Sequence, residues 1–96
     1  MYRIEQTEDF RSWHLGLRDL RAKAAIYRRI DCAEAGSLGD VKPVGEGVSE
    51  MRVDVGPGYR LYFTLRERTI VFLLYGGDKR TQDTDIRRAK KLAKEI

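Results

Sequence analysis

Cysteine, histidine and tryptophan each occur once in this sequence of 96 residues, and proline occurs twice. The single thiol, Cys32, excludes a disulfide within the chain. Cys32 and His14 are too few to form a Cys/His zinc site. The longest apolar run, Ile70–Tyr75, is far shorter than the roughly 20 residues of a membrane-spanning helix, and no apolar run follows the first methionine. We therefore expect no metal, no cofactor, no membrane insertion and a cytoplasmic location.

The composition fits a single domain over residues 1–96. Hydrophobic residues make up 42% of the chain, which suffices for one compact core. Nineteen Lys and Arg residues outnumber 15 Asp and Glu residues, which gives a formal net charge of +4 and a pI near 9.4. This modest excess favours an anionic partner such as a nucleic acid, but only weakly, because many basic proteins bind none.

The first third of the chain is predicted to form a short strand followed by helix. Residues 2–6 alternate apolar and polar side chains, and Thr7 is placed to cap a helix. Two apolar stripes at helical spacing follow: Phe10, Trp13, Leu17 and Leu20, then Ala22, Ile26, Ile30 and Ala33. The pattern allows one long helix or a helical hairpin. We favour a break near residues 18–21 and an end at Gly36.

Three single residues in these helices have simple structural interpretations. His14 lies on the polar side of the first helix, so we expect it to be exposed. Trp13 belongs to the apolar stripe and is expected in the core. Cys32 is expected to be a packing residue rather than a nucleophile, because no histidine accompanies it.

The rest of the chain is predicted to form an antiparallel meander and a last helix. Val41–Val44 can form only an edge strand because it contains Pro43. Strands are expected at 48–55 and 59–65, and Thr69–Tyr75, apolar on both sides, is expected to be a central strand covered on both faces. A loop should follow at Gly76–Arg80. Asp83 or Thr84 should then cap a helix whose buried stripe is Ile86, Ala89, Ala93 and Ile96. This order predicts an α+β fold with helices on one face of the sheet.

The two middle strands carry an outward face that is unusually polar. Its members are Glu50, Arg52, Asp54, Arg60, Tyr62 and Thr64. Pairing Arg52 with Tyr62 and Asp54 with Arg60 requires a turn of odd length at Gly56–Gly58. The pattern alone favours a solvated face held by cross-strand ion pairs, such as Glu50 with Arg60 and Arg52 with Asp54. The alternative is a phosphate-binding face, because the arginine fork matches phosphate oxygens and Tyr62 could stack on an RNA base.

Metal-independent RNA cleavage needs three roles: a base, a cation for the phosphorane, and an acid. Arginine stays protonated and can fill only the second role. Lys79 or Lys42 could act as acid or base if neighbouring cations lowered its pKa. Glu50 or Asp78 could serve as the base. The basic segment Asp78–Arg80 could close over one edge of the polar face.

Several segments together carry a resemblance to a known family. They are Gly39–Lys42, Gly47–Arg52, Gly56–Phe63, Leu74–Lys79, Gln82 with Asp85–Ile86, Phe10 with Trp13, and Arg28–Ile30. In these segments the chain resembles the HigB-like, phage Gp49-like branch (addiction module killer proteins) of the RelE/ParE toxin superfamily. The resemblance implies a RelE-like fold, in which an N-terminal strand, a helical hairpin and a C-terminal helix pack on a twisted antiparallel sheet.

The resemblance also implies the toxin of a type II toxin–antitoxin system, with a small helix-turn-helix antitoxin as its partner. RelE-like members cleave mRNA in the ribosomal A site without a metal, whereas ParE-like members poison DNA gyrase. Arg60 matches the sheet arginine that binds the scissile phosphate in RelE-like nucleases. Lys79 matches a basic residue at the end of the last strand. The chain departs from the better-known nucleases because a helix, rather than a histidine or tyrosine tail, follows Lys79.

These observations lead to three hypotheses about function. The first is a ribosome-dependent mRNA endoribonuclease with Arg60, Lys79 and Arg52 as catalytic residues. Its RNA contacts would come from Lys42, Tyr62 and Arg80. The second is a gyrase poison without catalysis, and the third is a non-toxic RNA-binding regulatory module.

Overall fold

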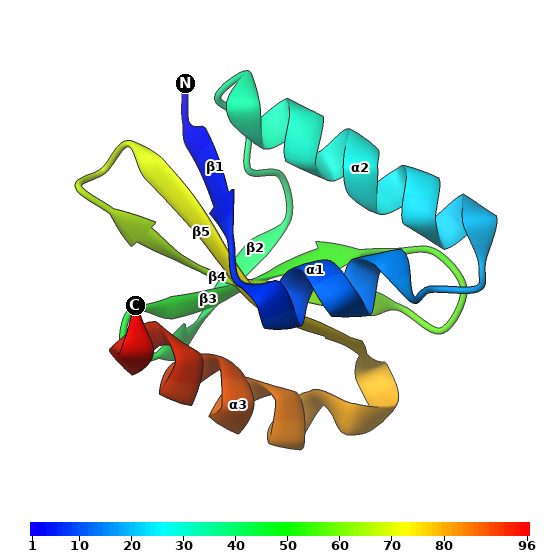
Figure 1. Ribbon diagram of the computed structural model, residues 1–96. Helices are drawn as coiled ribbons and strands as arrows, with labels where there is room; N and C mark the ends of the chain where they lie inside the picture. The colour runs from blue at the N-terminus through cyan, green and yellow to red at the C-terminus, as the bar shows by residue number, and fades with distance from the viewer.

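The computed structural model describes all of residues 1–96 as a five-stranded sheet with three helices (Figure 1). The elements in chain order are β1 (Arg3–Gln6), α1 (Glu8–Leu15), α2 (Leu20–Glu34), β2 (Val41–Gly45), β3 (Val48–Val53), β4 (Tyr59–Arg66), β5 (Ile70–Asp78) and α3 (Gln82–Glu95). A short 3-10 turn, Lys79–Thr81, precedes α3. The strand order is β1-β5-β4-β3-β2, and only β1 and β5 run parallel. The predicted α+β class is confirmed, and the architecture is compatible with a RelE-like fold.

The helical hairpin is confirmed. Thr7 caps α1 as predicted, because its hydroxyl oxygen accepts a hydrogen bond from the Phe10 amide at 3.0 Å. The same hydroxyl donates to the Leu74 carbonyl at 2.6 Å, which fastens the start of α1 to β5. Gly16 ends α1, and Asp19 caps α2 by accepting from two backbone amides of its first turn. The break therefore covers residues 16–19, close to the predicted position.

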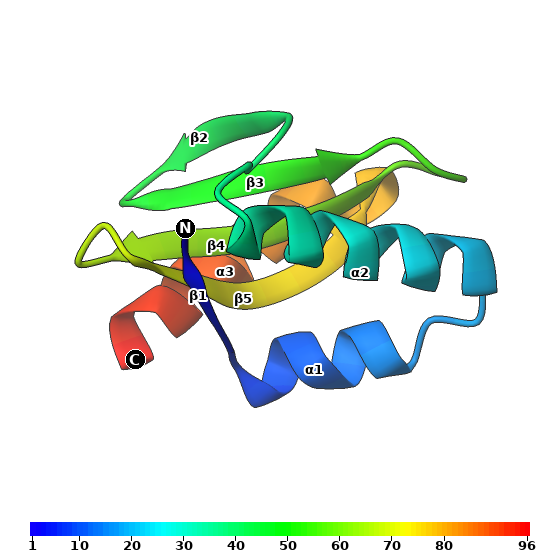
Figure 2. The same ribbon diagram turned by 90° about the horizontal axis from the view of Figure 1, so that it is seen from above.

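Helices cover both faces of the sheet, so the prediction of helices on one face is wrong. Figures 1 and 2 show α1 and α2 on one side and α3 on the other. The first core lies under α1 and α2 and includes Phe10, Ile26, Met51, Leu61 and Leu73. The second core lies under α3 and consists of Val48, Tyr62, Leu74, Ala89 and Leu92. The reason is the sheet itself: its inner strands bury apolar side chains on both sides, as the prediction for Thr69–Tyr75 required.

The hairpin between β3 and β4 has the predicted parity but a different register. Its turn spans residues 54–58, an odd number, with positive φ at Gly56 and Gly58. Arg52 lies opposite Arg60 rather than Tyr62, because β3 already ends at Val53 and Asp54 belongs to the turn. The predicted edge strand is confirmed as β2, which pairs only with β3.

Strand β5 continues through Gly76 and Gly77 to Asp78, so the predicted loop at this point is wrong. Both glycines are required for close packing rather than for a turn. A Cβ on Gly76 would lie 2.2 Å from the Trp13 ring, and a Cβ on Gly77 would lie 1.8 Å from Oδ2 of Asp85. Trp13 and Asp85 thus press on adjacent residues of one strand from opposite faces of the sheet.

The start of α3 also differs from the prediction. Thr81, rather than Asp83 or Thr84, occupies the N-cap position. Its hydroxyl donates to Asp85 at 2.6 Å instead of capping a backbone amide. Asp85 is buried against Gly77, and burial raises the pKa of its carboxyl. The predicted stripe packs on the second core, with Leu92 added to it. No helix in the chain has both the length and the apolar character needed to cross a membrane.

The three single residues in the hairpin have different surroundings. Trp13 packs against the first core, as predicted. His14 is only 4% exposed, so its predicted surface position is wrong; its ring lies against Tyr27 of α2, with ring centres 4.4 Å apart. Cys32 is exposed, and the packing role predicted for it is also wrong. Ile26 and Ala33 fill the core-facing side of α2 instead.

The contact between Gly76 and Trp13 generates a stability prediction. We expect Gly76→Ala to lower the free energy of unfolding by about 1–3 kcal/mol, because the added methyl group overlaps the large ring of Trp13 and forces it away from the strand. Urea denaturation measures the change. In a Trp13→Leu background the same substitution should cost less; equal costs in both backgrounds would show that the ring does not set the requirement for glycine.

Asp85 generates a pH-dependent prediction. Because its folded-state pKa is raised, its favourable contribution is fully present below the unfolded pKa and is lost as pH rises through the folded pKa. Asp85→Asn keeps the size of the side chain and an oxygen that can accept from Thr81. We therefore expect the variant to be more stable than the parent at neutral pH, with the difference shrinking towards pH 4. Denaturation across pH tests this, with the exposed Asp83→Asn as control.

Candidate phosphate-binding site

The candidate site is a hollow next to the β3–β4 turn, on the same face of the sheet as α3. Arg52 of β3 and Arg60 of β4 lie opposite each other in register and both line it. Asp40, Asp54 and Gly58 complete most of the wall, and the hollow has a volume of about 330 Å³. The structure thus brings together two of the three predicted catalytic residues.

A buried carboxylate holds Arg60. Nε of Arg60 lies 3.5 Å from Oε2 of Glu50, and this cross-strand pair was predicted. Glu50 is 1% exposed, and its other oxygen accepts a hydrogen bond from Nε2 of Gln82 at 2.9 Å. Nε of Arg60 has no well-aligned hydrogen bond, so the contact with Glu50 is mainly electrostatic. Because Glu50 is enclosed below α3, it can orient Arg60 but cannot reach a substrate.

Arg52 is held by Asp40 rather than by the predicted Asp54. Its Nη2 lies 2.9 Å from Oδ1 of Asp40, and its amide donates to the Asp40 carbonyl at 2.9 Å. Arg29 of α2 supports this segment by donating to the carbonyl of Arg52. The Arg52–Asp40 pair is largely solvent-exposed, so a phosphate can compete with the carboxylate for the guanidinium.

Lys79 and Arg80 lie in a second, adjoining hollow at the start of α3. Its volume is about 500 Å³, and its lining is entirely polar: Lys79, Arg80, Thr81, Gln82, Asp83, Thr84 and Arg87. The amide of Lys79 donates to the Gly58 carbonyl at 2.9 Å, which joins the rims of the two hollows. Lys79 is exposed and forms no ion pair.

Asp78 forms a salt bridge with Arg80. Its carboxylate accepts from the Arg80 guanidinium at 2.9 Å and from the Arg80 amide at 2.8 Å. The side-chain hydrogen bond from Arg80 lowers the pKa of Asp78. A carboxylate with a lowered pKa is a poorer general base, so Asp78 is a weak candidate for that role.

The sequence predicted an open polar face on the two middle strands. This prediction is wrong for the middle of the face, because α3 covers it. Tyr62 is 0% exposed and cannot stack on an RNA base. Burial raises the pKa of Tyr62, and its hydroxyl has no hydrogen-bond partner. Lys42, on edge strand β2 opposite Glu50, remains exposed.

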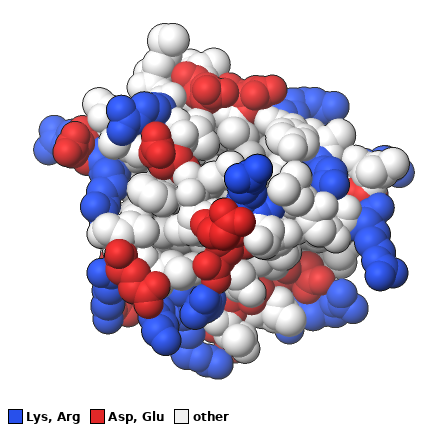
Figure 3. Space-filling model, viewed as in Figure 1, with Lys and Arg blue, Asp and Glu red and all other residues white.

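Two residues that shape the site, Asp40 and Gln82, had not been given a role by the sequence. Each acts on a residue far along the chain, and no local pattern marks such a contact. Nowhere do three or more His, Cys, Asp or Glu side chains gather in a metal-ligating arrangement. Figure 3 shows basic side chains along the edge where α3 lies in Figure 1, with acidic side chains among them. On the face that this view shows, the basic side chains are interspersed with acidic ones.

Comparison with known proteins identifies relatives across nearly the whole chain. The family model described as Phage derived protein Gp49-like matches residues 14–96. A protein of Haemophilus influenzae (strain ATCC 51907 / DSM 11121 / KW20 / Rd), named only as an uncharacterized protein, is 48% identical over 93 residues. The match covers 97% of this chain and 94% of that protein. The chain therefore belongs to the Gp49-like family of phage-derived proteins, a toxin-like family.

Proposed function

We propose that this chain is the toxin of a type II toxin–antitoxin system, and that it cleaves mRNA on the ribosome in the cytoplasm. The observation that carries the proposal is the pair Arg52 and Arg60, opposite each other at one hollow and each oriented by a carboxylate. Two guanidinium groups on one rigid sheet are suited to adjacent phosphate oxygens. Membership of a toxin-like family supports the same assignment.

In the proposed reaction the 2′-OH attacks the adjacent phosphorus while a base removes its proton. Arg60 stabilises the negative charge on the phosphorane, and Arg52 and Lys79 hold flanking phosphates. The bond to the 5′-oxygen then breaks, and an acid protonates the leaving oxygen. The products are a 2′,3′-cyclic phosphate and a 5′-hydroxyl. Lys79, exposed at the rim, is our candidate for proton transfer, with Lys42 as the alternative.

The cognate partner is proposed to be a helix-turn-helix antitoxin. Arg80 is a further RNA contact in this proposal, because it lines the same hollow as Lys79. Glu50 is a positioning residue for Arg60 and takes no part in proton transfer.

The burial of Glu50 determines how Arg60 must be tested. Arg60→Ala alone would leave a buried carboxylate without its cation, which typically costs about 3–5 kcal/mol. Loss of activity could then reflect loss of the fold. We therefore compare Glu50→Gln with Glu50→Gln/Arg60→Ala, since the glutamine removes the stranded charge from both variants.

We expect the double variant to lose at least ~100-fold in cleavage rate relative to Glu50→Gln, as when one donor to a developing anion is removed. Primer extension on translated messages after brief expression measures the cuts, and urea denaturation checks that both variants fold. Equal cleavage by two folded variants would contradict the role of Arg60. DNA double-strand breaks with intact messages would instead establish a gyrase poison.

The gyrase alternative has one observation in its favour: the acidic candidates for a base are unsuitable. Glu50 is buried, and Asp78 is tied to Arg80. A binding inhibitor needs no base, so this arrangement fits a protein that acts by contact alone. The role of Lys79 therefore separates the two hypotheses.

For a nuclease we expect Lys79→Gln to lower the cleavage rate by about 10²–10⁴-fold with little change in stability, because the side chain is exposed and unpaired. Lys91→Gln, an exposed substitution on α3, is the matched control and should cleave normally. If both variants lose activity only modestly and equally, Lys79 supplies charge rather than a proton.

A further inference from the structure

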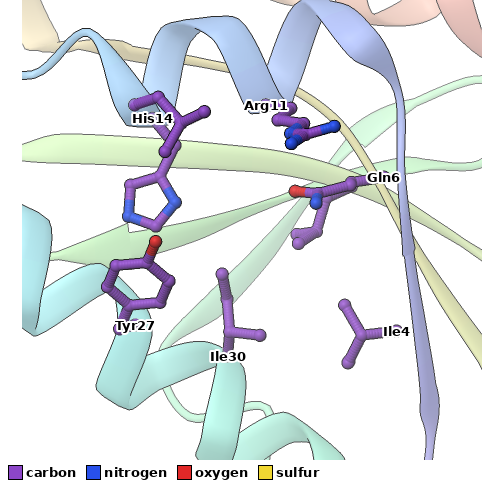
Figure 4. Close-up of a pocket in the computed structure, with 8 residues that line it drawn as sticks. Ile4, Gln6, Arg11, His14, Tyr27 and Ile30 are labelled. Atoms are coloured by element: carbon purple, nitrogen blue, oxygen red, sulfur yellow. The ribbon is translucent and has the colours of Figure 1, made fainter.

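A separate cavity opens between the helical hairpin and β1, on the face of the sheet opposite the arginines. Its volume is about 280 Å³. Figure 4 shows His14 and Tyr27 on one side, Arg11 and Gln6 on the other, and Ile4 and Ile30 below. Nothing in the proposed RNA cleavage uses these residues, which come from three different elements.

The chemistry of His14 is fixed by its surroundings. Nε2 of His14 lies 3.3 Å from the carbonyl oxygen of Lys23. A carbonyl only accepts, so Nε2 carries the hydrogen and Nδ1 is left as an acceptor. Burial lowers the pKa of His14, so the ring is neutral at pH 7. The cavity wall thus contains a neutral imidazole with one unused acceptor.

The opposite wall offers unused donors. Arg11 takes part in none of the ion pairs of the chain, although 15 acidic residues are present. Gln6 lies beside it in Figure 4, and both residues are exposed, so they form the open edge of the cavity. A cation and an amide side by side can both donate to one carboxylate, and such charge-assisted bonds are among the stronger ones.

The floor is apolar, with Ile4, Ile30 and Leu73, the last of which is 1% exposed. A floor of this kind favours a hydrocarbon body over a phosphate or a sugar. The volume is just below the usual range of about 300–1,000 Å³ for ligand pockets, which limits the occupant to a small molecule.

We propose that this cavity binds a small carboxylic acid with a compact apolar body, held by Arg11 and Gln6 through the carboxylate and by Ile4, Ile30 and Leu73 through the hydrocarbon. A hydrogen-bond donor on the body would add a contact to Nδ1 of His14. The site lies on the opposite face of the sheet from Arg60 and shares no lining residue with the arginine hollow.

The single tryptophan supplies a built-in probe for the test. The ring of Trp13 lies 6.5 Å from that of His14, centre to centre. We would titrate the purified full-length chain with 3-phenylpropionate at pH 7 and follow Trp13 fluorescence excited at long wavelength, where the phenyl group does not absorb. The uncharged 3-phenylpropan-1-ol has the same body without the carboxylate and serves as the ligand control.

We expect a saturable change with the acid and binding at least ~10-fold weaker with the alcohol, since one charge-assisted contact is lost. Arg11→Gln should weaken binding of the acid by a similar factor. Arg28→Gln is the matched control, because Arg28 is exposed on α2 and does not line the cavity; it should bind as the parent does. Amide resonances of Gln6 and Ile30 in a ¹⁵N correlation spectrum should shift along the same binding curve.

Three results would overturn the proposal. They are no saturable signal with the acid in the folded parent chain, equal binding of the acid and the alcohol, and unchanged binding by a folded Arg11→Gln variant. A fourth would replace it: protection of these residues by a protein partner, without any binding of the small acid, would make the cavity a protein docking site.

Discussion

The attachment of α3 to the sheet is the constraint on which the rest of this structure depends. The first turn of α3 lies directly on the backbone of β5, which is possible only because residue 77 has no side chain. Gln82 in the same turn donates to Glu50, and Glu50 in turn holds Arg60. The position of α3 thereby determines the direction of Arg60, which lies on the middle strand of the sheet, β4. Without α3, Glu50 would be solvated, and its hold on Arg60 would be screened to the level of a surface ion pair.

The two arginines of the site differ in how firmly they are held and in how much of each side chain is exposed. Arg60 is mostly enclosed, with 13% of its side chain exposed, whereas 39% of the Arg52 side chain is exposed. The inner arginine is therefore pre-oriented and can bind an anion without first losing side-chain freedom, which makes it suited to a developing charge. The outer arginine must leave Asp40 to bind fully, which makes it suited to a flanking phosphate. The two positions favour different roles although the residue type is the same.

Local patterns in the sequence were sufficient for most of the elements. Thr7 and the apolar stripes predicted the helices, Pro43 placed β2 at an edge, and the odd turn followed from side-chain alternation. The failures concern contacts between distant segments. Glycines at 76 and 77 fit a turn equally well by composition, and only the ring of Trp13 and the carboxylate of Asp85 show their purpose. His14 has a polar position on its own helix but is buried by α2, which no periodicity within α1 could indicate. For the site, the sequence pointed to Arg52 and Arg60 but misjudged Tyr62. Neither the β4 segment nor the α3 segment contains a pattern that indicates which face of the sheet α3 covers.

The paired glycines also join the two faces of the molecule. Trp13, next to the cavity residue His14, presses on Gly76, and Asp85, next to the candidate phosphate-binding hollows, presses on the following residue. At such distances neither group can move towards the sheet. Gly77 is also the cross-strand neighbour of Arg60. Close packing of this kind leaves no room for a side chain at either glycine position. The strand on which α1 packs is therefore also the strand that lies beside Arg60, although the two hollows share no lining residue.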